Sequence, residues 1–256
     1  LLADNVFYPA PGNHDLARQG EDLFERYFGD EQPGRHYTVR FGSSRLLVTD
    51  TNDDTSPLSD QTAWLTRELS LAAADPAVRH VFVVTHHPLY SISLHGGSES
   101  LRQSWAPLFA RYGVAAVFSG HDHCYARAEA DGVRYFVTGG AGAPLYPRDA
   151  DPAAEDEAAV VTFERAFHYL RVHVAGDLVE VAVIRDDGTL IESVGWGEAA
   201  PRARQSTFVT AGAVPPVPMH WPRRWGLAYG VGVGALCVVA VVIAAGVRAR
   251  RRARPR

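Results

Sequence analysis

Short runs of consecutive apolar residues recur along the chain and predict strands. Runs of this kind, without polar alternation, are typical of strands buried on both faces of a sheet. They occur at residues 6–10, 81–85, 114–119 and 133–138. Apolar residues at helical spacing lie between them, at 16–28, 60–74 and 99–112. Because strands and helices alternate in this way, we expect an α/β fold in which several strands run parallel.

Other segments predict antiparallel strands. Residues 36–41 and 45–49 are expected to form two strands joined by a Gly-Ser-Ser turn, and alternating patterns follow at 169–174, 178–184 and 189–192. The acidic, alanine-rich segment 149–159 is predicted to be a solvated insertion. The expected fold class is therefore α/β, with mixed β-sheets flanked by helices.

Residues 225–247 carry no charged side chain and predict one C-terminal transmembrane helix. A helix of this length would span about 34 Å, which exceeds the roughly 30 Å of a bilayer core. Residues 248–256 contain six arginines and no acidic residue. The positive-inside rule places this basic tail in the cytoplasm and residues 1–197 outside it, in a single-pass membrane protein. The alternative is a buried core helix, although such helices rarely reach this length without a polar residue.

Residues 198–224 are rich in proline and alanine and predict a stalk between the domain 1–197 and the membrane. Gly226, Gly230 and Gly234 recur every four residues and are a candidate homodimer face within the membrane.

The formal net charge is −4, and every acidic residue lies before residue 199. No basic face of the kind that binds nucleic acid is therefore expected.

Each apolar run is followed by residues that turn sharply or can bind a metal ion. These residues are Gly12-Asn13-His14-Asp15, His86-His87, Gly120-His121-Asp122-His123 and the glycine-rich loop from Gly139. Since the carboxyl ends of parallel strands form one rim, we expect these segments to meet in space. Imidazoles and an amide oxygen suit Zn, Mn or Fe. An ordinary surface loop is the alternative for the His-x-His pair alone. We expect His36, His168 and His173 to be structural.

In this order, the three histidine-containing clusters resemble signature blocks of the calcineurin-like metallophosphoesterases, particularly the branch that includes the purple acid phosphatases. The likeness covers about residues 5–195 and extends to the helix containing Trp64 and Leu65. It implies a metallophosphoesterase-like fold and the hydrolysis of phosphate mono- or diesters. An unrelated histidine-rich hydrolase is disfavoured because the chain has no H-E-x-x-H pattern.

The resemblance also implies a set of metal ligands. By position, Asn13, His86 and His121 resemble the ligands of one ion, and His123 resembles a ligand of the other. Within the histidine doublet His86 is preferred over His87, because the family's ligand precedes proline by two positions.

Three further residues resemble groups of the family that act on the substrate. His14 resembles a histidine that binds the phosphate or protonates the leaving group, and Asp15 would orient that histidine or its loop. His95 resembles a substrate-facing histidine, and a polar loop residue is the alternative.

The implied mechanism is two-metal hydrolysis, in which two divalent or trivalent ions activate a bridging hydroxide and hold the phosphoryl group. The family places two further blocks, which supply carboxylate ligands, before the position of Gly12, and only eleven residues precede it here. We therefore expect this chain to be the later part of a longer enzyme and to be inactive alone. The alternative is a non-catalytic, membrane-anchored surface protein that retains the fold for binding.

Overall fold

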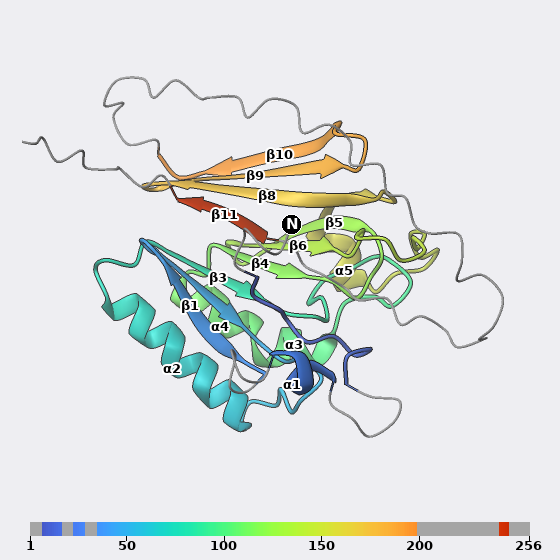
Figure 1. The fold of residues 1–256 in the computed structure, drawn as a ribbon. Helices are drawn as coiled ribbons and strands as arrows, with labels where there is room; N and C mark the ends of the chain where they lie inside the picture. The colour runs from blue at the N-terminus through green and yellow to red at the C-terminus, as the bar shows by residue number, and fades with distance from the viewer. Residues whose placement is uncertain (1–6, 17–22, 29–34, 199–240, 246–256) are drawn as a thin grey trace, which may run out of the picture.

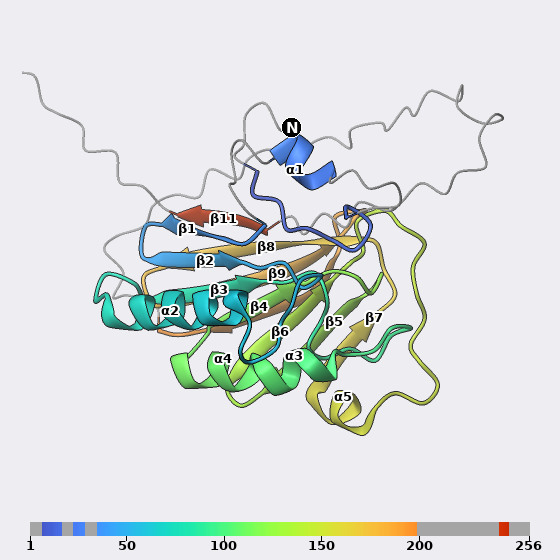
Figure 2. The same ribbon diagram turned by 90° about the horizontal axis from the view of Figure 1, so that it is seen from below.

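The computed structural model describes residues 7–16, 23–28, 35–198 and 241–245. A four-stranded sheet lies over a seven-stranded sheet, and helices cover the opposite face of the larger sheet (Figure 1). These helices are α2 (Asp60–Ala74), α3 (Glu99–Ser104) and α4 (Ala106–Tyr112), which lie along one side in Figure 2. The arrangement confirms the expected α/β class with mixed sheets flanked by helices.

The larger sheet combines a parallel centre with antiparallel edges. Its strand order is β1 (Tyr37–Phe41), β2 (Ser44–Val48), β3 (His80–Val84), β4 (Ala116–Ser119), β6 (Val133–Thr138), β5 (Tyr125–Ala130) and β7 (Val160–Glu164). The strands β2, β3, β4 and β6 are parallel neighbours, whereas β1, β5 and β7 pair antiparallel. The carboxyl ends of the four parallel strands therefore lie at one edge of the sheet.

Strand β3 explains why the central strands are apolar throughout. Val81 and Val83 face a core shared with the helices, where Leu65 of α2 is buried. Phe82 belongs to a second core between the two sheets, which also contains Leu170 and other residues of the smaller sheet. Both faces of the strand are thus covered, and each large apolar side chain that is buried contributes roughly 1.5–3 kcal/mol.

The smaller sheet has the order β10 (Leu190–Trp196), β9 (Leu178–Arg185), β8 (His168–Ala175) and β11 (Val241–Ala245). Along β8, buried and exposed residues alternate, because one face packs on the inter-sheet core and the other faces solvent. The strands predicted at 169–174, 178–184 and 189–192 are confirmed.

Several local predictions are wrong for identifiable reasons. Of the predicted strand 6–10, residues 7–10 form no strand, since Pro9 lacks an N–H and its carbonyl oxygen accepts a hydrogen bond from Tyr37 Oη at 2.6 Å. The predicted helix 99–112 is two helices, because Pro107 in the first turn of α4 favours a new helix start at Trp105. Of the predicted helix 16–28, α1 covers Leu23–Phe28, and residues 17–22 lie outside the described part.

The segment 149–159 is not a simple solvated insertion. It contains α5 (Ala154–Ala159), and the Asp156 side chain is only 2% exposed. Its carboxylate pairs with Arg102 of α3 at 2.9 Å and accepts hydrogen bonds from the backbone N–H groups of Ser91 and Gly97. The ion pair and these bonds offset only part of the cost of burying the charge, because burial still raises the pKa of Asp156. Composition alone cannot reveal this long-range arrangement.

Most of the predicted C-terminal features lie outside the described residues. These features are the stalk after residue 198, the glycines Gly226, Gly230 and Gly234, the tail 248–256 and residues 225–240 and 246–247 of the predicted helix. The five described residues of that helix, Val241–Ala245, form strand β11 beside β8 instead. Their β-branched composition suits a strand, and β8 offers an edge for pairing. Within the described ranges, no helix has the length and apolar character needed to cross a bilayer.

Candidate metal centre

The predicted meeting of the clusters occurs at the carboxyl ends of the parallel strands. His86 follows β3, and His121 and His123 follow β4. Residues of the loop before α1 reach the same edge, so that Asn13 contacts His86 although 73 residues separate them. The rim therefore brings together groups from distant parts of the sequence.

Three side-chain atoms converge at the centre of this rim. His86 Nε2 lies 2.8 Å from Asn13 Oδ1 and 3.2 Å from His121 Nδ1. Two ligand atoms of one metal ion are separated by about 3.0–3.5 Å when each lies roughly 2.1 Å from the ion. The 3.2 Å between the two imidazole nitrogens lies in this range, and the 2.8 Å to Asn13 Oδ1 is slightly shorter. Two imidazoles with an amide oxygen suit Zn, Mn or Fe.

The backbone at His121 directs this convergence. His121 has a φ of 64°, in the left-handed region that residues other than glycine rarely occupy. The N–H of Asp122 donates across His121 to the Gly120 carbonyl at 2.7 Å, and the N–H of Cys124 then donates to the Asp122 carbonyl at 2.8 Å. The turn is therefore tight, and unusual backbone conformations of this kind cluster at functional sites.

The protonation state of the cluster suits cation binding. Burial lowers the pKa of His86 to about 2 and that of His121 to about 3, and neighbouring imidazoles add to both shifts. Both rings are therefore neutral at neutral pH, the state in which imidazole binds a metal ion.

His123 lies beside this cluster and is held by the loop that follows β6. Its Nδ1 donates to the Pro144 carbonyl at 2.8 Å, which leaves Nε2 with a lone pair. The ring stacks on Tyr146 at 4.1 Å between centroids, and the Tyr146 N–H donates to the His123 carbonyl at 2.9 Å. His123 is 6% exposed. A histidine whose Nδ1–H is held by a carbonyl and whose Nε2 carries a lone pair has the tautomer expected of a metal ligand.

The loop with Asn13 is shaped by two of its own residues. The Asp15 carboxylate accepts from the Gly12 N–H at 2.8 Å, and the Asp15 N–H donates to the Gly12 carbonyl at 3.1 Å. Gly12 packs closely on the His86 ring, because a Cβ built there would lie 3.0 Å from Cε1 and Nδ1. His14 is exposed next to the cluster and contributes to the lowered pKa of His86 and His121.

The loop with His95 is tied to the histidine cluster through Asp122. This carboxylate is fully buried and accepts from Ser91 Oγ and from the His95 N–H, the latter at 3.1 Å. The His95 ring lies 4.4 Å from the His121 ring and 5.3 Å from the Tyr146 ring. The structure therefore brings His95 to the site, on an exposed position beside His121.

The histidines predicted to be structural lie in packing or surface positions. The His36 ring packs on Trp64 at 4.6 Å, and His173 lies 3.4 Å from Glu180 on the smaller sheet. His168 is buried, and its Nδ1 donates to the Ala166 carbonyl at 2.9 Å. Its Nε2 has no hydrogen-bond partner within the described residues.

Residues 1–125 match the protein family described as calcineurin-like phosphoesterase. The chain carries a calcineurin-like metallophosphoesterase domain. The family resemblance noted from the motifs is thereby confirmed.

Curated relatives of this metallophosphoesterase domain include acid phosphatases. Tartrate-resistant acid phosphatase type 5 of Mus musculus is 30% identical over 131 residues, which cover 51% of this chain and 37% of that protein. The protein of the same name from Oryctolagus cuniculus is 34% identical over 109 residues, covering 43% and 31%. Purple acid phosphatase 1 of Ipomoea batatas is 30% identical over 124 residues, covering 48% and 23%. The chain thus spans about a third or less of the length of these relatives.

Solved structures share the fold of the metallophosphoesterase domain. The purple acid phosphatase PPD1 from yellow lupin aligns over 74% of this chain and 38% of its own, with a TM-score of 0.59 and 17% identity. GAP50, described as the anchor in the inner membrane complex of Plasmodium, aligns over 65% of this chain and 55% of its own, with a TM-score of 0.52 and 17% identity. At this identity the likeness concerns the fold.

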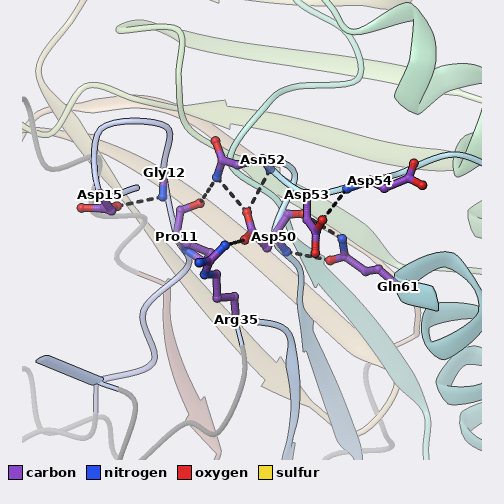
Figure 3. A network of polar contacts seen from close by, with 9 residues as sticks. All are labelled: Pro11, Gly12, Asp15, Arg35, Asp50, Asn52, Asp53, Asp54 and Gln61. Carbon is purple, nitrogen blue, oxygen red and sulfur yellow. Dashed lines mark hydrogen bonds and ion pairs between the residues drawn. The ribbon is translucent and has the colours of Figure 1, made fainter. Parts of the chain in front are cut away.

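Sequence analysis missed the contribution of the loop after β2 to the metallophosphoesterase site. Asp50 is buried, and its carboxylate accepts from Asn52 and lies 3.5 Å from Arg35 (Figure 3). Asn52 Nδ2 also donates to the Pro11 carbonyl at 3.3 Å, which connects this loop to the segment before Asn13. The signal was the Asp-Thr-Asn sequence directly after a strand, at the same edge as the histidines.

His87 also lies at the site, although it was not chosen as a ligand. Ligand atoms of His86, His87 and His121 lie within 4.8 Å of one another and form a candidate metal-binding group in the described part of the domain. Thr51, next to Asp50, lies 2.8 Å from His87 Nδ1 through its hydroxyl oxygen. The geometry thus brings a fourth potential donor to the cluster of Asn13, His86 and His121.

Proposed function

We propose that this chain belongs to a metal-dependent phosphoesterase that hydrolyses phosphate mono- or diesters. The observation that carries the proposal is the convergence of Asn13 Oδ1, His86 Nε2 and His121 Nδ1 at the strand ends of a metallophosphoesterase domain. Acid phosphatases among the curated relatives support ester hydrolysis as the reaction class.

In this proposal Asn13, His86 and His121 hold one ion, and His123 contributes Nε2 to a second ion. The donor set is compatible with Mn, Zn or Fe. When bound, such ions supply Lewis acidity toward a phosphoryl oxygen and lower the pKa of a coordinated water. The neutral state of His86 and His121 means that neither ring must lose a proton before it binds an ion at neutral pH.

The remaining residues act on the substrate. His14 is exposed beside the cluster, so its imidazolium form can donate a charge-assisted hydrogen bond to a phosphate oxygen or a proton to the leaving group. The His95 ring lies 4.4 Å from the His121 ring and presents a second exposed imidazole to a bound ester. Asp15 and Asp122 hold the two loops that carry these histidines.

The test is hydrolysis by the gene product extended upstream of Leu1, loaded with Mn or Zn, against a panel of phosphate mono- and diesters. We expect turnover in the extended protein, strongly reduced by His14→Ala, and none in the 256-residue chain. The surface variant His173→Ala serves as the matched control and should retain full turnover. An extended, metal-loaded protein that hydrolyses no member of the panel contradicts the proposal.

A non-catalytic binding protein is the second candidate. It is favoured by the fold likeness to GAP50, which is described as an anchor in a membrane complex. The same assay separates the two functions, because this candidate predicts a folded, extended protein with no turnover under any metal.

We further propose that the apolar segment 225–247 anchors the protein in the cell membrane, with the catalytic domain outside the cytoplasm and the tail 248–256 inside. The absence of charge over this segment and the six arginines after it support the proposal. Gly226, Gly230 and Gly234 would then form the homodimer contact within the membrane. Residues Val241–Ala245 cannot form strand β11 and a membrane helix at the same time. The proposal therefore requires that they leave β8 in the membrane-bound protein.

Membrane fractionation with protease protection tests the anchoring. The intact chain should be recovered with membranes, and a chain ending at residue 224 should be released. Recovery of the intact chain in the supernatant contradicts the anchor.

A further inference from the structure

The loop that carries His95 is closed by its own backbone. Residues 88–98 form this His95 loop, and the N–H of Ser98 donates to the Pro88 carbonyl at 2.8 Å across its base. The His95 side chain is exposed, and its ring lies 4.4 Å from the His121 ring. Because an exposed side chain has little packing to hold it, the place of this ring depends on how the backbone of the loop is anchored.

Asp156 of α5 is buried against the base of the His95 loop. Its Oδ2 accepts from the N–H of Gly97, 59 residues earlier in the chain, at 3.0 Å. Its Oδ1 accepts from the Ser91 N–H at 3.2 Å and from Arg102 Nη1 at 2.9 Å. A backbone N–H can only donate and a carboxylate ion can only accept, so the direction of these bonds is fixed. Ser91 precedes His95 and Gly97 follows it, and the carboxylate therefore joins the two sides of the loop.

Gly97 shows how closely this contact is packed. A Cβ built on Gly97 would overlap Asp156 Oδ1 and would lie 2.5 Å from both Arg102 Nη1 and the Leu89 carbonyl oxygen. Arg102 Nη1 itself donates to this carbonyl at 2.7 Å. The loop thus has glycine at the point where it meets the buried ion pair of Asp156 and Arg102.

Ser91 connects Asp156 to the centre of the site. Its N–H donates to Asp156, and its hydroxyl donates to the buried Asp122 carboxylate. Asp122 in turn accepts from the His95 N–H at 3.1 Å. The backbone of His95 is therefore held by two buried carboxylates, directly by Asp122 and through Ser91 by Asp156.

Other bonds attach the same loop to the segment before α5. The Asp149 N–H donates to the Ile92 carbonyl at 2.8 Å, and Ser93 Oγ donates to the Pro147 carbonyl at 3.0 Å. These bonds do not involve Asp156. A change at Asp156 should therefore release the base of the loop and shift His95 without detaching the whole loop.

We propose that Asp156 is a positioning residue of the phosphoesterase site. By fixing the base of the His95 loop, it holds the His95 imidazole where the ring can donate a hydrogen bond to an oxygen of a phosphate group bound at the ion beside His121. Asp156 is buried and acts through His95 alone. This inference rests on the proposed phosphoesterase function and gives α5 a role at that site.

The experiment measures inorganic phosphate binding to the Zn-loaded 256-residue chain by isothermal titration calorimetry, together with the Zn content and the free energy of unfolding. Asp156→Asn keeps the size of the side chain but turns an NH₂ group toward one of the donors. Gly97→Ala disturbs the same contact from the loop and leaves the carboxylate in place. Both changes are made alone and together with His95→Ala. Glu155→Gln, at an exposed position next to Asp156 on α5, is the matched control.

We expect His95→Ala, Asp156→Asn and Gly97→Ala each to weaken phosphate binding about tenfold, as for one lost hydrogen bond to a charged group. The Zn content should be unchanged. In the His95→Ala background neither second change should weaken binding further, because a positioning residue acts only through the group that it positions. Glu155→Gln should bind phosphate as the unaltered chain does.

Additive losses in the double variants would show a general structural role and overturn the inference. A loss of Zn in Asp156→Asn, or unchanged phosphate affinity in any of the three single variants at the loop, would overturn it as well. If Asp156→Asn does not fold, Gly97→Ala decides by the same criteria.

The outcomes also separate this inference from the proposed function. If the extended protein hydrolyses esters while Asp156→Asn and Gly97→Ala bind phosphate normally, this inference alone fails. A Zn-loaded chain that binds no phosphate overturns the inference, and together with an inactive extended protein it overturns the proposed function too.

Discussion

His121 shows how a single residue can accept an unfavourable backbone in order to place a side chain. Its left-handed φ of 64° costs about 1–2 kcal/mol for a residue with a Cβ. In return, its Nδ1 lies 3.2 Å from His86 Nε2, in the position from which both rings can face one ion. The position is therefore set by the function of the site and not by local backbone preference.

Gly12 has a comparable effect through close contact. A Cβ at this position would lie 3.0 Å from two atoms of the His86 ring and 3.2 Å from Asp15 Oδ2. We predict that Gly12→Ala displaces His86 from Asn13 and weakens Zn binding by about tenfold or more, as for other changes in groups that orient a ligand. Competition with a chromophoric chelator measures this affinity.

The control is Gly195→Ala in β10, where an added Cβ would meet its nearest atoms at 3.7 Å, an ordinary contact. This variant should bind Zn as the unaltered chain does. Equal affinity in Gly12→Ala would mean that His86 tolerates the shift, and the proposed role of Gly12 would be wrong.

At the scale of elements, Asp122 joins two loops of the site. It lies between two predicted ligands on the loop after β4, and its buried carboxylate accepts from Ser91 and His95 on the loop after β3. Asp122→Ala would leave the Ser91 hydroxyl and the His95 N–H without their buried acceptor. Each unsatisfied donor costs about 1–3 kcal/mol.

We therefore predict that Asp122→Ala lowers the free energy of unfolding by at least about 2 kcal/mol, measured by urea denaturation. Asp151→Ala, which removes an exposed carboxylate from the loop before α5, is the control and should leave the free energy unchanged. Equal stability of the two variants would show that the link between the loops contributes nothing.

Glu192 connects the two sheets. From β10, its carboxylate accepts from Arg127 and Tyr125 of β5 and from Thr162 of β7. Burial raises the pKa of Glu192, but the hydrogen bonds from Arg127, Thr162 and Tyr125 outweigh it, so the pKa lies below its ordinary value. A carboxylate with a lowered folded-state pKa stabilises the protein above its unfolded-state pKa, and this contribution is lost as the pH falls through the folded-state value.

We predict that Glu192→Gln destabilises the chain by about 1 kcal/mol at pH 7, because water partly screens these charges. The difference should begin to shrink as the pH falls below the ordinary glutamate pKa of about 4.3 and should be lost as it passes through the lower folded-state pKa. Thermal unfolding across this pH range provides the measurement. Glu129→Gln removes the more exposed carboxylate paired with the same Arg127 and should have a smaller effect at every pH. A pH-independent difference for Glu192→Gln would contradict the assigned charge interaction.

These elements also explain what the sequence could and could not predict. Strand β3 was predictable because Val81, Phe82 and Val83 alternate between two cores, which requires apolar residues on both faces. Strand β5 was not, because it contains Arg127 and Glu129, and Arg127 finds a second partner in Glu192 from the other sheet. Such a partner is distant in sequence and leaves no local pattern.

At the site, too, some residues could be predicted from the sequence and others could not. The histidines were predictable because they follow apolar strands and resemble family blocks, and their meeting follows from parallel strand order. Thr51 was not predictable, because a threonine hydroxyl is chemically unspecific and its partner His87 lies 36 residues away.

At the scale of the whole molecule, the seven-stranded sheet presents one rim at which loops from five parts of the chain contribute side chains. The chain spans about a third of the length of its acid phosphatase relatives, and Asn13, His86 and His121 converge at the described rim. The central claim is therefore that Asn13, His86 and His121 together bind one metal ion.

The most direct test is the Zn content and the X-ray absorption spectrum of the 256-residue chain and its alanine variants. We predict stoichiometric Zn with imidazole scattering, and loss of that Zn in His86→Ala and His121→Ala but not in His36→Ala or His173→Ala. A chain that binds no Zn, or that retains it undiminished without His86 and His121, would contradict the claim.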